Sequence, residues 1–170
     1  MTRATDADGR SWRPGPAAFE LGTDGPGTIV VGIDGSPTSM RALAYAAGQA
    51  RRQHGRLVAV YVQGFSDPWA GLDPGTYVDP AAAVTATLAA GDATQTELRT
   101  ELQRVGRACG VEIRFVVRRG ETLRELAEVA DREHADAVIV GSSTRLGHRL
   151  AGSLAVRLVR HSGWPVTVVP

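Results

Sequence analysis

The chain has 170 residues, of which 43% are hydrophobic and 22% charged, and its formal net charge is +1 at pH 7. This balance predicts one soluble domain with a sizeable core, and it argues against a protein built to bind nucleic acid. The single cysteine, Cys109, excludes an internal disulfide, and no run reaches the roughly 18 apolar residues of a membrane span, so we expect a cytoplasmic protein without a membrane partner.

All 19 basic side chains are arginine, because the chain contains no lysine. A P-loop needs a lysine to reach the β- and γ-phosphates, and Schiff-base catalysis needs a side-chain amine. Both classes of site are therefore excluded.

Residues 1–27 are polar, rich in glycine and proline, and without regular hydrophobic spacing. Such a composition is typical of disorder. We predict a disordered N-terminal leader followed by one domain over residues 28–170.

Short apolar runs alternate with helical patterns along that domain. Runs rich in β-branched residues predict five strands, at residues 28–34, 57–63, 111–118, 137–141 and 165–169. Helical spacing predicts four helices, at residues 37–54, 81–108, from Thr122 onward and at 152–161, with a long loop at 64–80. Ser36 is typical of an N-cap, and Thr122 with Glu125 predicts a capping box. The residues of the first helix expected to face the sheet are Met40, Leu43, Ala44 and Ala47.

Strands that alternate with helices predict a parallel sheet, since each right-handed crossover places a helix on one face. Five strands and four helices suit the doubly wound, flavodoxin-like α/β arrangement, a three-layer sandwich. Ligands of such folds lie at the carboxyl ends of the strands. If the first and fourth strands are neighbours, Asp34 and Gly141 line the same crevice.

Four segments together resemble the universal stress protein family. In chain order they are Val31–Ser36, Ala135–Ser142, Gly152–Ser153 and Pro165–Val169. The resemblance covers residues 28–170 and implies strand order 3-2-1-4-5 and a homodimer. It also implies a role in the stress response and binding of ATP or another adenine nucleotide, with or without Mg²⁺.

The nucleotide-binding members of that family carry a phosphate motif: glycine, two residues, glycine, nine residues, then glycine followed by serine or threonine. This chain keeps the ends of the motif as Gly141 and Gly152-Ser153. Thr144 replaces the middle glycine, however, and only seven residues separate Thr144 from Gly152. Because glycine lets backbone N–H groups approach phosphate oxygens, Thr144 adds a side chain where contact is closest.

The resemblance also implies roles for single residues. Asp34 would contact the ribose or adenine and Val62 the base. The residues that would hold the ribose and phosphates are Val140, Gly141, Thr144, Gly152, Ser153 and Leu154. Residue chemistry alone leaves structural alternatives open: Asp34 and Gly141 as turn residues, Gly141 also as a helix-facing glycine, Ser153 as an N-cap and Val62 as core.

The sequence contains no pattern that predicts catalysis. It lacks a Gly-x-Ser-x-Gly elbow and a glycine fingerprint after a strand, and its four histidines have no metal-ligand spacing. Two hypotheses remain. The first is a nucleotide-binding regulatory module, favoured by the retained ends of the phosphate motif. The second is a stress-response dimer that binds no nucleotide and acts through protein partners, favoured by Thr144 and the shortened loop.

The last predicted strand has an apolar edge, Val166–Val169, protected only by Pro170. Proteins usually pair or cover such an edge. We therefore predict a homodimer in which two copies of this strand pair antiparallel. Trp164 either packs across that interface or caps the local core.

Overall fold

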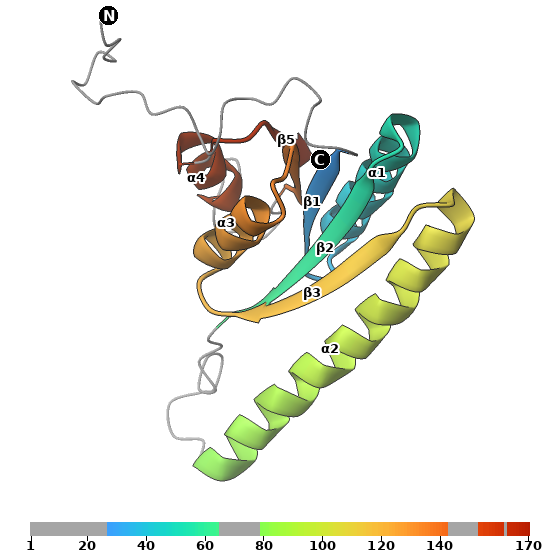
Figure 1. Cartoon of the computed structure of the whole chain (residues 1–170). Coiled ribbons are helices and arrows are strands. Elements are labelled where there is room, and N and C mark those ends of the chain that lie inside the picture. The colour runs from blue at the N-terminus through green and yellow to red at the C-terminus, as the bar shows by residue number, and fades with distance from the viewer. Residues whose placement is uncertain (1–26, 65–78, 143–152, 162) are drawn as a thin grey trace, which may run out of the picture.

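The computed structural model describes residues 27–64, 79–142, 153–161 and 163–170 (Figure 1). Its strands are β1 (Thr28–Ile33), β2 (Arg56–Gln63), β3 (Ile113–Arg119), β4 (Ala137–Gly141) and β5 (Val166–Val169). Its helices are α1 (Pro37–Gln53), α2 (Pro80–Cys109), α3 (Thr122–Arg132) and α4 (Ser153–His161). The predicted elements are confirmed to within two residues. The predicted leader up to residue 26, most of the predicted long loop and residues 143–152 lie outside the described residues.

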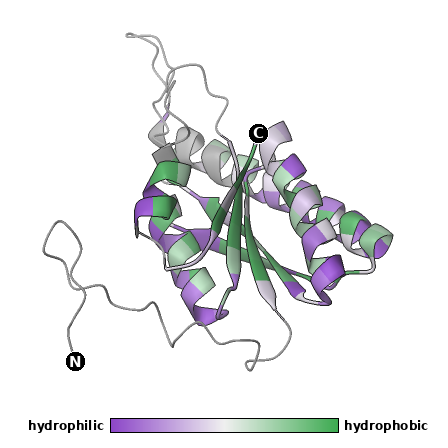
Figure 2. Ribbon diagram, turned by 90° about the horizontal axis from the view of Figure 1, so that it is seen from above, coloured by the Kyte–Doolittle hydropathy of each residue, from purple (hydrophilic) through white to green (hydrophobic). Residues whose placement is uncertain are grey.

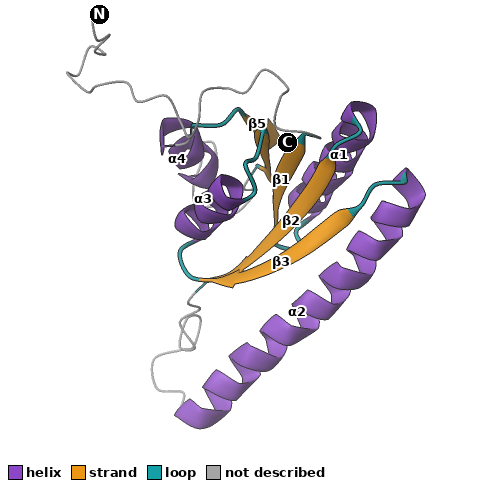
Figure 3. Cartoon of the chain, viewed as in Figure 1, coloured by secondary structure: helices purple, strands orange, loops and turns teal. Residues whose placement is uncertain are grey.

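The five strands form one parallel sheet in the order β3-β2-β1-β4-β5, which confirms the implied order. Helices α1 and α2 pack on one face, and α3 and α4 on the other (Figures 1 and 3). Seen from above in Figure 2, largely apolar strands lie between two layers of helices whose outward faces carry most of the hydrophilic residues. The chain is a three-layer α/β sandwich, as predicted.

The central strand β1 is buried on both faces, as in parallel sheets generally. Ile29 and Val31 pack in the core below α1, together with Leu43. Val30 points the other way and packs with Leu126 of α3. A slip of one residue would exchange these two sets, so burial fixes the position at which β1 ends.

Helix α1 begins as predicted, with Ser36 as N-cap and Pro37 in the first turn. Leu43 and Ala47 are buried as expected, but the prediction for Ala44 is wrong, because Ala44 is exposed. The buried stripe runs instead through Ala42, Ala46 and Ala50. Alanines on the two sides of this helix have the same hydropathy, so spacing alone could not choose between them.

The predicted capping box of α3 is also wrong. The N-cap is Glu121, whose carboxylate accepts a hydrogen bond from the Arg124 backbone N–H at 2.8 Å, and Thr122 is the first helical residue. Glu121 also pairs with Arg157 of α4. That contact joins residues far apart in the sequence.

Helix α2 has 30 residues and ends at Gly110, which adopts a left-handed φ of 64°. Leu98 and Leu102 are buried, and Val105 and Cys109 pack against the same core, as predicted. Gly91 lies beside Gln63, the last residue of β2, since a Cβ on Gly91 would meet the Gln63 side chain. The part of α2 before Gly91 therefore extends past the carboxyl edge of the sheet (Figure 1).

Candidate functional site

A crevice of about 710 Å³ lies at the carboxyl ends of β1 and β4. Because these strands are neighbours, the loop after β1 and the end of β4 face the same space. Its described walls come from three strands and from the N-terminal parts of three helices. They include Gly32, Ile33, Asp34, Val60, Val62, Val140, Gly141, Ser36, Thr38, Ser39, Glu121, Thr122, Leu154 and Arg157. The predicted meeting of Asp34 and Gly141 is confirmed.

One wall of the crevice is apolar. Val60 and Val62 of β2 contribute to it from one side, and Leu126 of α3 from another. Val62 is half-buried and packs against the core under α3 and α4, so it is both a core residue and a wall residue. An apolar wall beside polar groups is typical of a pocket for a flat heterocycle.

Asp34 forms the turn that leads from β1 into α1. Its Oδ1 accepts a hydrogen bond from the Ser36 backbone N–H at 2.9 Å, and its own N–H donates to Ser39 Oγ at 3.2 Å. Gly35 between them has a φ of 82°, which favours glycine. Asp34 is thus a turn residue that also lines the crevice.

The same hydrogen bonds determine the charge of Asp34. Partial desolvation alone would raise its pKa, but hydrogen bonds from Ser36 and Ser39 outweigh it and lower the pKa below the ordinary value. Asp34 is therefore an ionised carboxylate at neutral pH. It is suited to accept hydrogen bonds from hydroxyl groups.

Gly141 ends β4 directly against the first turn of α1. A Cβ at this position would lie 2.7 Å from the carbonyl carbon of Thr38 and 2.8 Å from the backbone nitrogen of Ser39. Real Cβ atoms do not come this close to backbone, so only glycine fits here. The helix-facing alternative for Gly141 accounts for the residue type, and Gly141 lines the crevice as well.

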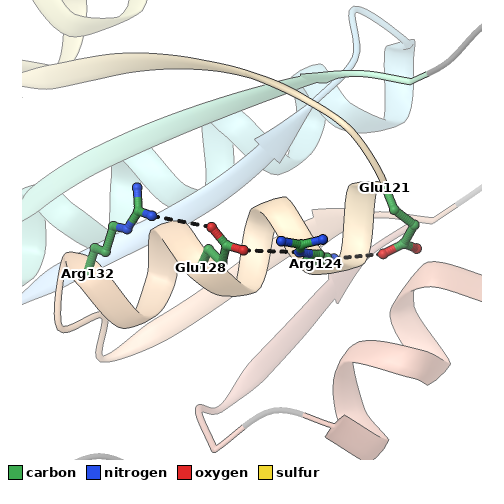
Figure 4. A network of polar contacts seen from close by, with 4 residues as sticks. All are labelled: Glu121, Arg124, Glu128 and Arg132. Atoms are coloured by element: carbon green, nitrogen blue, oxygen red, sulfur yellow. Dashed lines mark hydrogen bonds and ion pairs between the residues drawn. The ribbon is translucent and has the colours of Figure 1, made fainter.

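Sequence reasoning missed an ion pair at this site. Arg157 of α4 lies 2.9 Å from the carboxylate of Glu121 at the start of α3, and both side chains are about half exposed, at 50% and 49%. The hydrogen bond from the Arg124 backbone N–H and the charge of Arg157 lower the pKa of Glu121. Figure 4 shows Glu121 at the head of a chain of polar contacts that continues along α3 through Arg124, Glu128 and Arg132. In the sequence, the signal for Arg157 was its place one helical turn after Ser153.

Three helices begin at the crevice, and their N-terminal ends carry partial positive charge. The carboxylate of Glu121 already occupies the end of α3, and Asp34 lies beside the end of α1. The end of α4 contributes Leu154 and the Arg157 guanidinium to the crevice, beside the Glu121 carboxylate. Its geometry suits an anionic group of a ligand.

The structure brings Asp34, Val62, Val140, Gly141 and Leu154 together around this one crevice. Ser153 is the first residue of α4, and its side chain is outside the description. Thr144 and Gly152 lie outside the described residues.

None of the described helices is long and apolar enough to cross a membrane. In the described part of the chain, no three His, Cys, Asp or Glu residues are grouped so that they could hold a metal ion.

Comparison with known proteins gives a consistent picture. A model of the Universal stress protein family matches residues 26–170. Universal stress protein MJ0531 of Methanocaldococcus jannaschii is 27% identical over 143 residues, which cover 83% of this chain and 80% of that protein.

Two solved structures extend the comparison. Universal stress protein UspA from Lactobacillus plantarum superposes with a TM-score of 0.68 at 22% identity, covering 85% of this chain and 97% of that one. A universal stress protein in complex with cAMP superposes with a TM-score of 0.57 at 26% identity, covering 85% and 96%.

Gly141→Ala tests the close approach of β4 and α1. The new methyl group must displace backbone of the first turn of α1, so we expect the free energy of unfolding to fall by about 1–3 kcal/mol in urea titrations. The control is Gly64→Ala, because a Cβ at Gly64 meets nothing within 4 Å. Equal stability of the two variants would contradict the packing argument.

Asp34→Asn tests the charge of the turn. Asparagine keeps an oxygen acceptor but loses the charge. Since the folded-state pKa of Asp34 is lowered, its stabilising effect is present above the unfolded pKa of about 3.9 and disappears as pH falls through the folded pKa. The variant should be less stable than the parent at pH 7, and this difference should shrink below about pH 4. A difference in urea midpoint that stays constant with pH would show that the charge is irrelevant.

Proposed function

The chain belongs to the universal stress protein family, and we propose that it is a regulatory module of the stress response that binds an adenine nucleotide, ATP or a relative, in the crevice. The observation that carries this proposal is that an apolar wall and the N-terminal end of α4, with the Arg157 guanidinium, line the same crevice. A nucleotide needs both features. The complex of a related universal stress protein with cAMP supports the choice of adenine.

In this proposal the base lies against Val62 and its apolar neighbours. The ribose hydroxyls donate to Asp34, whose low pKa keeps it an acceptor. Val140 and Gly141 lie beneath the sugar and the first phosphate.

The phosphates then lie at the start of α4, with Gly152, Ser153 and Leu154 around them and Arg157 as the cation. Arg157 is half exposed and pairs with Glu121, and an exposed pair of this kind is weak enough for a phosphate to compete. Thr144 borders the phosphates in place of the motif glycine. The nucleotide binds with or without Mg²⁺ on its phosphates.

We assign this site to binding and not to catalysis. The two described carboxylates of the crevice, Asp34 and Glu121, have lowered pKa values, so neither holds a proton to donate at neutral pH. The described lining includes neither histidine nor cysteine, and the sequence has no lysine. We place the protein in the cytoplasm.

A second function is favoured by one observation, the altered phosphate motif. Thr144 replaces the motif glycine and the loop is two residues shorter than in nucleotide-binding members, a change that would move the backbone N–H groups of a phosphate loop. A chain that has lost nucleotide would act as a dimer through protein partners.

Calorimetry with ATP, ADP and cyclic AMP, each with and without Mg²⁺, separates the two functions. We expect micromolar affinity for at least one nucleotide. Arg157→Gln should lower the affinity for ATP about tenfold and the affinity for cyclic AMP less, because it removes one charge-assisted hydrogen bond to the longer phosphate chain. Arg160→Gln, on the same helix but outside the described lining, is the control. If well-folded protein gives no heat with any of the three, the nucleotide proposal is wrong and the second function takes its place.

We also propose that two copies pair through β5. This strand is an edge of the sheet, and Val168 on it is 41% exposed. Val156 and Val159 of α4, which packs beside β5, are exposed too. An antiparallel pair of β5 strands would cover these side chains with two-fold symmetry.

Sedimentation at micromolar concentration should show a dimer, and Val168→Arg should dissociate it, because like charges would meet across the axis. Tyr45→Arg is the control, since Tyr45 is equally exposed but lies on α1. A parent protein that sediments as a monomer would remove this proposal.

A further inference from the structure

The edge of the sheet opposite β5 is formed by β3, which pairs only with β2. The Leu57 N–H donates to the Glu112 carbonyl at 3.3 Å, and the Gly120 N–H donates to the Gln63 carbonyl at 3.0 Å. Main-chain groups of successive strand residues point to opposite sides, so the even-numbered residues of β3 face β2. The N–H and C=O groups of the odd-numbered residues, from Ile113 to Arg119, point away from the sheet.

This assignment agrees with the position of a nearby arginine. The Val117 carbonyl accepts a hydrogen bond from the Arg118 guanidinium at 3.4 Å, which is the contact expected of an outward-facing carbonyl. The edge has seven residues and contains no proline. It is therefore long enough, and sufficiently regular, to accept another strand.

A groove of about 500 Å³ lies beside this edge, between α2 and β3. Leu102, Ile113 and Phe115 form its apolar floor. None of the described residues that line it comes from α1 or β2, so it opens on the free side of β3. In Figures 1 and 3, α2 and β3 lie side by side as the outermost described elements on this flank. Alternate side chains of an added strand would enter the groove.

Positive charge surrounds both the groove and the edge. The Arg99 guanidinium lies 5.3 Å from the centre of the Phe115 ring. Arg107, further along the same helix, also lines the groove. On the other face of β3, Arg114 pairs with Glu133, the residue that follows α3, and the Arg118 side chain donates a hydrogen bond to the Val117 carbonyl of its own strand. Arg119 bonds Gln63 at the end of the strand.

This charge pattern discriminates between occupants. If two copies of β3 paired antiparallel about Val116, Arg114 would lie opposite Arg118, and like charges opposite one another are destabilising. A strand with acidic residues on that face would instead gain opposite-charge pairs. In that register the charges oppose a second copy and favour an acidic partner.

We propose that the β3 edge and the α2 groove form a docking site for an extended segment of a partner protein in which apolar and acidic residues alternate. The segment adds to the sheet as a strand beside β3. Its apolar side chains enter the groove, and its acidic side chains face Arg114 and Arg118. No described residue lines both this groove and the nucleotide crevice, so the proposal does not depend on nucleotide binding.

The test uses the full chain and two fluorescent peptides of about eight residues, the length of an ordinary strand. One peptide alternates valine with glutamate and the other alternates valine with lysine. We expect saturable binding of the glutamate peptide at micromolar concentration, measured by anisotropy, and no binding of the lysine peptide. Two variants then locate the site.

Val117→Pro removes an outward-pointing N–H at an edge position, where proline is tolerated. It should lower the affinity for the glutamate peptide about fivefold to tenfold. Arg114→Glu combined with Arg118→Glu should reverse the preference toward the lysine peptide. Arg41→Glu is the control, because Arg41 is an exposed residue of α1, away from the groove, and this change should alter neither affinity.

Three outcomes would overturn the proposal. They are no binding of the glutamate peptide, equal binding of both peptides, and binding that all the variants leave unchanged. Sedimentation of Val117→Pro adds a fourth outcome, because dissociation of a parent dimer would assign this edge to a second copy of the chain. Since the paired arginine substitutions lie on the surface, they keep the test decisive if Val117→Pro fails to fold.

Discussion

The close approach of β4 to the first turn of α1 determines the geometry of the whole carboxyl edge. Gly141 leaves no room for a Cβ between the strand and the backbone of Thr38 and Ser39. The same turn is held by Ser36, whose Oγ accepts from the Ser39 N–H at 3.2 Å, and by the Ser39 hydroxyl, which donates to the Ser36 carbonyl at 3.0 Å. Because strand and helix meet here without a spacer, Asp34 and the end of β4 are held in fixed relation at this edge of the crevice.

Most of the fold could be predicted because its signals are local. β-branched runs that end at glycine or proline defined the strands, and Ser36 with Pro37 defined the start of α1. The adjacency of Asp34 and Gly141 followed from chain order once the sheet was doubly wound. These inferences needed only hydrophobic period and connection rules.

What the sequence could not supply depends on distant neighbours. Glu121 and Thr122 both carry an oxygen that can accept from N–H groups of the first turn, and in the structure Glu121 caps the helix and also pairs with Arg157 of another helix. The sequence placed Gly141 at the site, but the reason that only glycine fits is the close approach of the Thr38 and Ser39 backbone to β4. Ile113 and Phe115 of β3 were visible in the sequence as apolar residues, but the groove that they line exists only with α2 in place.

Helix α2 has a consequence of its own. Its residues before Gly91 extend past the sheet, so this part does not pack on the strands as the turns around Leu98 and Leu102 do, and it depends more on intrinsic helix propensity. Alanine is abundant there, and the Thr85 hydroxyl bonds the Ala81 carbonyl four residues earlier. The first turns of α2 should therefore open and close by local unfolding, while the turns around Leu98 and Leu102 exchange their amide hydrogens only with the global transition. One continuous helix would then contain two cooperative units, divided where the sheet ends.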